Sequence, residues 1–468
     1  MEEKIQDTSS LNPLALGLLL VLVCLTWLLP RRHAFSPLLI MIGLMPMGQQ
    51  IVIAGLHFHL FRILLLCGIC RVIIRGEAAQ LKLKGIDKLF IWWAIVSIVF
   101  GTLSKPSTAL LINRLGDVYN ALGCYFFARC VIVELEDVVV SVRTLAFVTL
   151  PIAAFMLVEN RTSHNLLAVF GGVSEITVIR EGQLRCQGAF RHPILAGVFG
   201  ATQFPLFVAL WRYRSSSRLL ALIAGVSSLI IVVTAHSSGG LLALIAVIAG
   251  LALWRVKKAM PLIRWGALLA VLGLAMVMKA PVWYLIAKLS EVAGGTGWHR
   301  AWLIDQAIAH WDEWWLFGTT YTAHWGPAGE VTPADPNMMD ITNHYVMEGV
   351  KGGMLKLGLF LAIIVSCFRG IGQRLRAKSL RLPDEFFVWA LGVAFFAHCL
   401  SFISANYFDQ TILVWYWLQA SICCITNGAV LTKDSYETCR STIEAKYSRY
   451  RVPREGMTAR RAGSVIFK

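Results

Sequence analysis

Long apolar runs separated by short polar segments recur along almost the whole chain. The first of them, LALGLLLVLVCLTWLL, shows no alternation of apolar and polar positions. A run of about 17 to 25 such residues can cross a hydrocarbon core of about 30 Å as a helix. Because lipid offers the backbone no hydrogen-bond partners, only helices or closed barrels span it, and unbroken runs exclude a barrel. The pattern predicts an all-α, polytopic transmembrane helical bundle.

Hydropathy predicts 12–13 spans in this bundle. The candidate segments are 14–29, 36–55, 59–74, 88–103, 108–133, 138–158, 190–211, 217–234, 238–255, 264–281, 345–368, 386–404 and 409–428. Thirteen spans with a cytoplasmic C-terminus place the N-terminus outside. A cytoplasmic N-terminus would instead require one of the first three segments to be half-inserted.

Composition agrees with a membrane protein. The 468 residues are 57% hydrophobic and 15% charged, with a mean hydropathy of +0.65, which is too apolar for a soluble chain of this size. The net charge of +16 is attributed to Lys and Arg retained in cytoplasmic loops, and no nucleic-acid partner is predicted. Most cysteines lie inside apolar runs, where Cys acts as a small hydrophobe. No disulfide framework, metal or cofactor is predicted.

The basic loops predict which face each segment occupies. Four of them, at 71–88, 211–218, 254–264 and 368–381, are rich in Lys and Arg and are expected in the cytoplasm. The loops 159–189, 235–237, 282–344 and 405–408 then lie on the outer face. A membrane domain, 1–432, is followed by a basic cytoplasmic tail, 433–468.

The large outer loop, 282–344, is expected to carry an amphipathic helix at the membrane interface within 294–318. Its apolar positions recur at helical spacing: Leu303, Ala307, Ile308, Trp311 and Trp315. Arg300 lies near the start of this helix, where a cation and helix N-terminal amides together suit an anion.

A strongly basic patch runs into the seventh apolar segment. Arg180, Arg185, Arg191 and His192 lie within thirteen residues, and Pro193 follows where a membrane helix should begin. This pattern predicts a cationic pocket at the outer edge of the bilayer.

Other polar residues adjoin the membrane. A short turn, TAHSSGG, is predicted on the same outer face at 234–240. Asn343 and His344 end the large outer loop, and a histidine near neutral pKa is a natural general base, although structural roles are common for such a residue. Arg114 and Asp117 lie three residues apart in the fifth span, where they are expected either to pair structurally or to mark a functional site.

Three segments resemble the family of O-antigen ligases and O-antigen polymerases, which are membrane glycosyltransferases. LRCQGAFRHPILAG is similar to the family's R-x-x-G-x-F-x-H/N-P-x-x-x-G segment. TAHSSGGLLALIAVIAGLAL is similar to its Thr/Ser-rich turn and small-residue helix. TNHYVMEGVKGGMLKLGLFLAII is similar to its His-Asn segment, with Gly353 ten residues after the Asn. The resemblance covers roughly residues 185 to 365.

The resemblance implies roles for individual residues. Arg185 or Arg191 would bind the pyrophosphate of an undecaprenyl-linked donor, with His192 and Asn343 in the same substrate-binding set. Arg300 would help to position donor or acceptor. His344 is the candidate catalytic base, and metal-independent transfer is expected.

The chain departs from the family pattern at two positions. Ser238 stands where the family has an arginine, and Thr342 stands where it has the histidine that precedes the Asn. Either His344 has taken over as the base, or the chemistry is altered or lost.

These inferences predict a bacterial inner-membrane glycosyltransferase that acts at the periplasmic face. Its partners would be the lipid bilayer, a polyprenyl-pyrophosphate-linked glycan donor, a glycan or lipid acceptor and polysaccharide assembly proteins. Polymerase and ligase activity both remain open. A transporter or flippase of an anionic lipid or sugar, or a non-catalytic member of a polysaccharide export complex, is the alternative.

Overall fold

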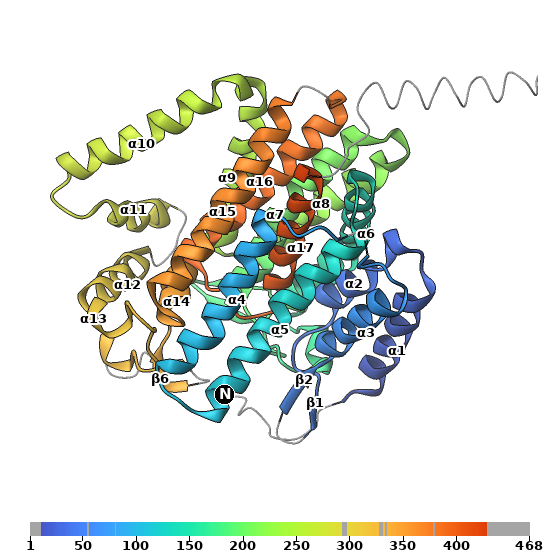
Figure 1. Ribbon diagram of the computed structural model, residues 1–468, viewed down its shortest axis with the longest axis horizontal. Coiled ribbons are helices and arrows are strands. Elements are labelled where there is room, and N and C mark those ends of the chain that lie inside the picture. The colour runs from blue at the N-terminus through green and yellow to red at the C-terminus, as the bar shows by residue number, and fades with distance from the viewer. Residues whose placement is uncertain are drawn as a thin grey trace, which may run out of the picture.

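A computed structural model describes residues 11–427, apart from 54–55, 80, 293–296, 327–330, 333–334 and 378–379. The predicted basic tail, 433–468, lies outside the described residues. The described chain is predominantly helical (Figure 1), with only three two-stranded antiparallel hairpins. The predicted all-α class is therefore confirmed.

Each of the predicted spans contains a helix. These helices are α1 (Pro13–Leu28), α2 (Ser36–Leu44), α3 (Leu60–Ile74), α4 (Gly85–Leu103), α5 (Thr108–Val131), α6 (Leu135–Thr162), α7 (Pro193–Tyr213), α8 (Arg218–Thr234), α9 (Ser238–Ala252), α10 (Met260–Val277), α15 (Gly353–Arg376), α16 (Leu382–Ser404) and α17 (Thr411–Asn427). Seven helical segments of the described chain are long and apolar enough to cross a membrane, one of them the continuous stretch Ser238–Val277. The chain is a multi-pass membrane protein.

The ends of the helices follow local sequence signals. Asn12 caps α1 with its side chain, and Ser107 caps α5 in the same way, which satisfies backbone N–H groups that have no partner within the helix. Proline occupies the first turn of α7 and α16, where its missing N–H costs nothing.

The basic loops gather on one face, which we call the basic face. Ion pairs join the loops there: Arg31 with Asp137 at 3.3 Å, Arg214 with Glu136 at 2.8 Å, and Lys257 with Glu385 at 2.6 Å. The guanidinium of Arg71 reaches the Leu29 carbonyl at the end of α1. The basic loops therefore lie on one face of the bundle, as their charge predicts.

The opposite face, called here the loop face, carries the described residues of 45–59, 163–192, 235–237, 297–343 and 405–410. The Cys186 N–H donates to the Thr234 carbonyl at 3.1 Å, which joins 163–192 to the last residue of α8, next to 235–237. The Asn12 side chain donates to the Val169 carbonyl, so α1 begins on the loop face. The Cys424 thiol near the end of α17 donates to the Ile132 carbonyl near the basic face. These positions agree with an odd number of passes.

The small strands lie on the loop face. They pair as β1 (Gln50–Ile53) with β2 (Leu56–His59), β3 (Val178–Arg180) with β4 (Gln183–Arg185), and β5 (Val331–Thr332) with β6 (Asp335–Met339). Short 3-10 turns complete the connections: η1 (Arg31–His33), η2 (Leu166–Phe170), η3 (Ser215–Ser217), η4 (Leu253–Ala259), η5 (Val282–Tyr284) and η6 (Ala323–Trp325).

The large outer segment folds into short helices, α11 (Leu285–Val292), α12 (Gly297–Ala309), α13 (Trp311–Trp314) and α14 (His344–Val350). The expected interfacial helix corresponds to α12 and α13 (Figure 1). Its buried face differs from the predicted one. Leu303, Ala307 and Trp314 pack in a small core, whereas Ile308, Trp311 and Trp315 are exposed.

Two helices contrast in their packing. Helix α17 lies in the middle of the bundle (Figure 1), and Trp415 and Trp417 on it are fully buried. Helix α10 stands apart at an angle to the other long helices (Figure 1) and has no buried residue. A kink at Val256, where φ and ψ are not helical, separates α10 from α9.

Candidate functional site

The basic patch forms a hairpin on the loop face. Strands β3 and β4 turn at Glu181 and Gly182, whose φ angles are 54° and 75°, a conformation that glycine adopts without steric cost. The hairpin contacts the turn between α8 and α9, because a ring nitrogen of His236 lies 2.7 Å from the Leu184 carbonyl oxygen. The patch and the TAHSSGG turn thus meet, as their predicted common face requires.

Four cationic or titratable groups influence one another in this region. The charge of Arg180 lowers the pKa values of Arg185, His192 and Arg300. Burial is the largest cause in each case. Arg300 is 5% exposed, and the Nε of Arg185 is buried without a hydrogen-bond partner among the described residues. Three of the sequence-predicted residues therefore lie in one electropositive cluster, together with Arg180.

His192 contributes a donor to this cluster. Its Nδ1 accepts a hydrogen bond from the Ile194 N–H at 3.1 Å and caps α7. Burial, followed by Arg185 and Arg180, lowers the pKa of His192 to about 4. The imidazole is therefore neutral near pH 7, and because Nδ1 accepts, Nε2 carries the proton.

Two helix N-termini lie side by side next to the turn. A Cβ on Gly240 in α9 would come within 2.8 Å of the Gly197 Cα in α7, so the two backbones touch. Both helices run from the loop face towards the basic face. Ser237 precedes α9, and its buried hydroxyl has no partner among the described residues. The positive ends of both helix dipoles add to the potential of the arginines.

Arg191 points to a different neighbourhood. Its backbone N–H donates to the Asp409 carboxylate at 3.3 Å, and its side chain is exposed. Its charge acts on His59 at the start of α3. Arg191 therefore adjoins the cluster through the backbone, while its guanidinium faces the β1–β2 side.

Asn343 and His344 lie at the start of α14. The Asn343 side chain caps this helix by accepting from the Tyr345 and Val346 N–H groups at 3.0 and 3.2 Å. His344 is 7% exposed, and its Nδ1 lies 2.6 Å from the Asn406 side-chain oxygen. Burial is the main cause that lowers its pKa, against the opposing effects of Glu348 and Asn406.

The loop 405–410 connects His344 with the basic patch. Asn406 contacts His344, and the Gln410 side chain donates to the Ala189 carbonyl at 2.7 Å. Asp409, between them, accepts from Arg191 as described above. His344 and the segment 189–191 of the basic patch thus pack on opposite ends of one six-residue segment.

A buried polar network beside His344 was not predicted from the sequence. Glu348 accepts from the Trp93 indole at 2.7 Å, and its carboxylate lies 3.4 Å from the Lys356 ammonium and 4.0 Å from His344 Nε2. The signal for this network in the sequence was the presence of Glu348 and Lys356 at the start of an apolar run, since charges at that depth are costly unless they are paired.

The charges of α5 line a separate open groove of about 640 Å³ on the loop face. Arg62, Arg114, Asp117 and Lys351 all contribute to its wall. Asp117 lies 3.8 Å from the Lys351 ammonium, whereas the buried Nε of Arg114 has no partner in the described part of the chain. The Arg114–Asp117 pairing suggested by their spacing is replaced by a long-range pair.

A scan against protein-family models and a search of curated proteins found no match to this chain. The site is therefore interpreted from its own residues. Arg185, His192 and Arg300 belong with Arg180 to the electropositive cluster, Arg191 borders it, and Asn343 and His344 belong to the neighbouring buried network.

Proposed function

We propose that this protein is a membrane glycosyltransferase that polymerises or ligates undecaprenyl-pyrophosphate-linked glycan at the periplasmic face of the bacterial inner membrane. The observation that carries the proposal is the cluster of Arg180, Arg185, Arg300 and the His192 N–H beside the N-termini of α7 and α9. A pyrophosphate at the end of a lipid would meet this cluster at the start of the membrane helices.

The chemistry fits these residue types. Displacing a polyprenyl pyrophosphate from a sugar increases the negative charge on the leaving oxygen. Fixed guanidinium groups stabilise that charge and hold phosphate oxygens in bidentate geometry. The unpartnered Nε of Arg185 is a donor available for this purpose.

In this proposal His344 takes the proton from the acceptor hydroxyl. Burial keeps its imidazole neutral, as a base requires, and Glu348 at 4.0 Å would stabilise the imidazolium once it forms. Both ring nitrogens face protein groups. Access of an acceptor therefore requires Asn406 and the loop 405–410 to move, in keeping with catalytic contacts that form only in the substrate complex.

The groove lined by Arg114 and Lys351 is the proposed approach for the acceptor glycan. It lies on the loop face, and its volume is within the range of about 300 to 1,000 Å³ usual for small-molecule sites. Lys351 joins α14 to the groove, because it follows the helix that carries His344 and Glu348.

The test is transfer by the purified full-length chain in detergent, supplied with a polyprenyl-pyrophosphate-linked oligosaccharide and an acceptor glycan. Released polyprenyl pyrophosphate is measured. We expect Arg185→Ala to lower the rate about 100-fold or more, as loss of a charge-stabilising donor does elsewhere. Arg161→Ala, which removes an exposed arginine on the same face, should leave the rate unchanged.

Unchanged release in Arg185→Ala and in the Arg185→Ala/Arg191→Ala double variant would overturn the proposal. Transfer in detergent also separates it from a transporter, because no second compartment is present. A wild-type chain that binds the donor without releasing pyrophosphate would favour the non-catalytic alternative.

A further inference from the structure

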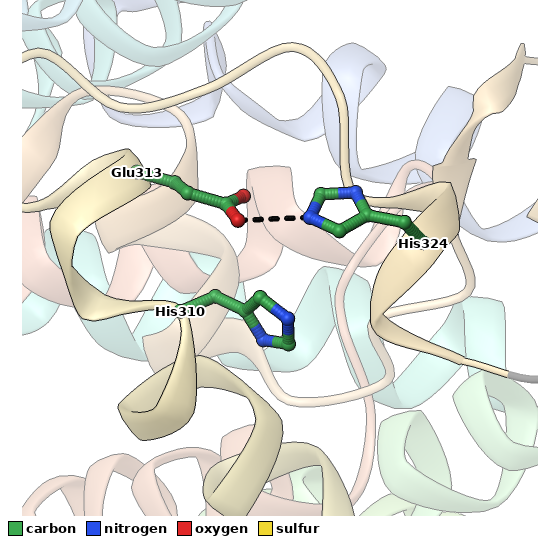
Figure 2. A group of neighbouring side chains, drawn as sticks. All are labelled: His310, Glu313 and His324. Carbon is green, nitrogen blue, oxygen red and sulfur yellow. Dashed lines mark hydrogen bonds and ion pairs between the residues drawn. The ribbon is translucent and has the colours of Figure 1, made fainter.

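The outer segment brings together three side chains that the proposed transfer does not use. His310 follows α12, Glu313 lies in α13, and His324 lies in η6. One potential ligand atom from each lies within 4.8 Å of the other two. Figure 2 shows the three side chains pointing towards one another.

The orientation of His310 leaves one nitrogen for a ligand. Its Nδ1 lies 2.9 Å from the Gln306 carbonyl oxygen and must donate to it. In the neutral ring Nε2 is then an acceptor with a lone pair. A backbone carbonyl that fixes the far nitrogen in this way is the usual support of a metal-binding histidine.

The other two ligands are also held in place. One oxygen of Glu313 accepts from the Trp325 indole at 3.0 Å, while the other lies 2.8 Å from His324 Nε2. Trp325 is buried in the small core of this segment and stacks on the His310 ring at 5.3 Å between centroids. A single buried tryptophan therefore supports two of the three groups.

We propose that His310, Glu313 and His324 form a binding site for a divalent transition-metal ion, with Zn²⁺ the best fit. Two imidazoles and one carboxylate are a common Zn²⁺ ligand set that leaves a fourth position for water. Ca²⁺ and Mg²⁺ prefer sites made of oxygen ligands, so the two histidines disfavour them. Tetrahedral Zn²⁺ needs ligand atoms roughly 3.3 Å apart, so Glu313 and His324, now 2.8 Å apart, would separate slightly, and the His310 nitrogen would lie at a similar distance from both.

The bound ion would cross-link α12 and α13 to the η6 turn. Arg300 lies on α12, so the cross-link orders the segment that carries one member of the arginine cluster. This role leaves the expectation of metal-independent transfer unchanged, since the ion holds the segment and does not contact the pyrophosphate. The site also stands independently of the proposed function.

The test uses the full-length chain, purified in detergent, stripped with a chelator and titrated with Zn²⁺ against a chromophoric chelator. We expect one high-affinity ion per wild-type chain. His310→Ala and His324→Ala should each weaken binding by at least about a hundredfold, because loss of a group that merely supports a ligand already costs about 10–100-fold. His299→Ala, a histidine on α12 outside the triad, is the matched control and should bind as wild type.

A second measurement does not depend on variants. Co²⁺ bound to the wild-type chain should give the intense visible absorption of a tetrahedral site, and added Zn²⁺ should displace it, whereas Mg²⁺ should not. Zn²⁺ should also raise the thermal midpoint of the wild-type chain, since a ligand that binds only the folded state stabilises it. Absence of Zn²⁺ binding by wild type, or wild-type affinity in His310→Ala, would reduce the triad to a simple Glu313–His324 hydrogen bond and overturn the proposal.

Discussion

Gly197 of α7 and Gly240 of α9 touch through their backbones: a Cβ on Gly240 would lie 2.8 Å from both the Cα and the carbonyl carbon of Gly197. Small residues allow such close approach between membrane helices. The contact sets the two helix N-termini next to each other, beside the hairpin that carries Arg180 and Arg185. The Gly197–Gly240 contact therefore places the positive ends of two helix dipoles beside the arginines of the loop face.

Gly240→Ala is expected to separate α7 from α9. The added methyl group meets backbone atoms, which cannot rotate away as a side chain can. Overpacking of this kind costs about 1–3 kcal/mol and should lower the thermal midpoint in detergent. Gly266→Ala on α10, where no atom lies within 4 Å of the new Cβ, is the matched control. Equal midpoints for the two variants would contradict the close contact.

The ion pair of Asp87 with Arg129 is expected to contribute to the fold and not to transfer. The Arg129 Nε lies 2.9 Å from an Asp87 oxygen, and Tyr125 donates to the same carboxylate. Asp87→Asn leaves the buried guanidinium without its counter-ion, a change that costs about 3–5 kcal/mol in buried pairs.

The companion variant is Glu136→Gln, which breaks a partly exposed pair with Arg214 and should cost no more than about 1 kcal/mol. Detergent melting curves measure both variants. If Asp87→Asn melts no earlier than Glu136→Gln, the Asp87 pair does not hold α4 to α5.

His192 predicts a pH dependence of stability. Its pKa is lowered from 6.5 to about 4 in the folded chain, so the unfolded chain binds more protons between these values. The contribution of the neutral imidazole to the free energy of unfolding is therefore fully present above pH 6.5. It is lost as the pH falls from 6.5 towards 4. His192→Asn keeps a capping side chain at α7. In this variant the thermal midpoint should change less with pH over the same window than in wild type. If the thermal midpoint of this variant falls as steeply with pH as that of wild type, another group causes the pH dependence.

Most span positions could be predicted because apolar length and loop charge are both local properties. The predicted span 36–55 is an exception, because α2 ends at Leu44 and β1 follows it. The six-residue turn 213–218 and the loop 254–258 lie on one face, as their arginines and lysines indicate. The partner of Asp117 could not be predicted in this way. Spacing favoured Arg114 on the same helix, but Lys351 comes from a segment more than two hundred residues away and only packing brings it there.

The outer segment shows the same limit. Helical spacing located α12, yet the buried side of α13 carries Trp314 in place of Trp311 and Trp315. The chain turns at His310, between the two helices, and this break rotates the face that follows. The His310–Glu313 spacing was a readable signal for a metal site, whereas His324 enters only through the fold of the intervening loop.

The central position of α17 has a consequence for how the chain is made. Trp415 and Trp417 fill the middle of the bundle, and the Arg129 guanidinium reaches the sulfur of Cys424 on the same helix. All the other described helices leave the ribosome before this one. The part of the interior that Trp415 and Trp417 fill is therefore closed only after all the other described helices have been synthesised.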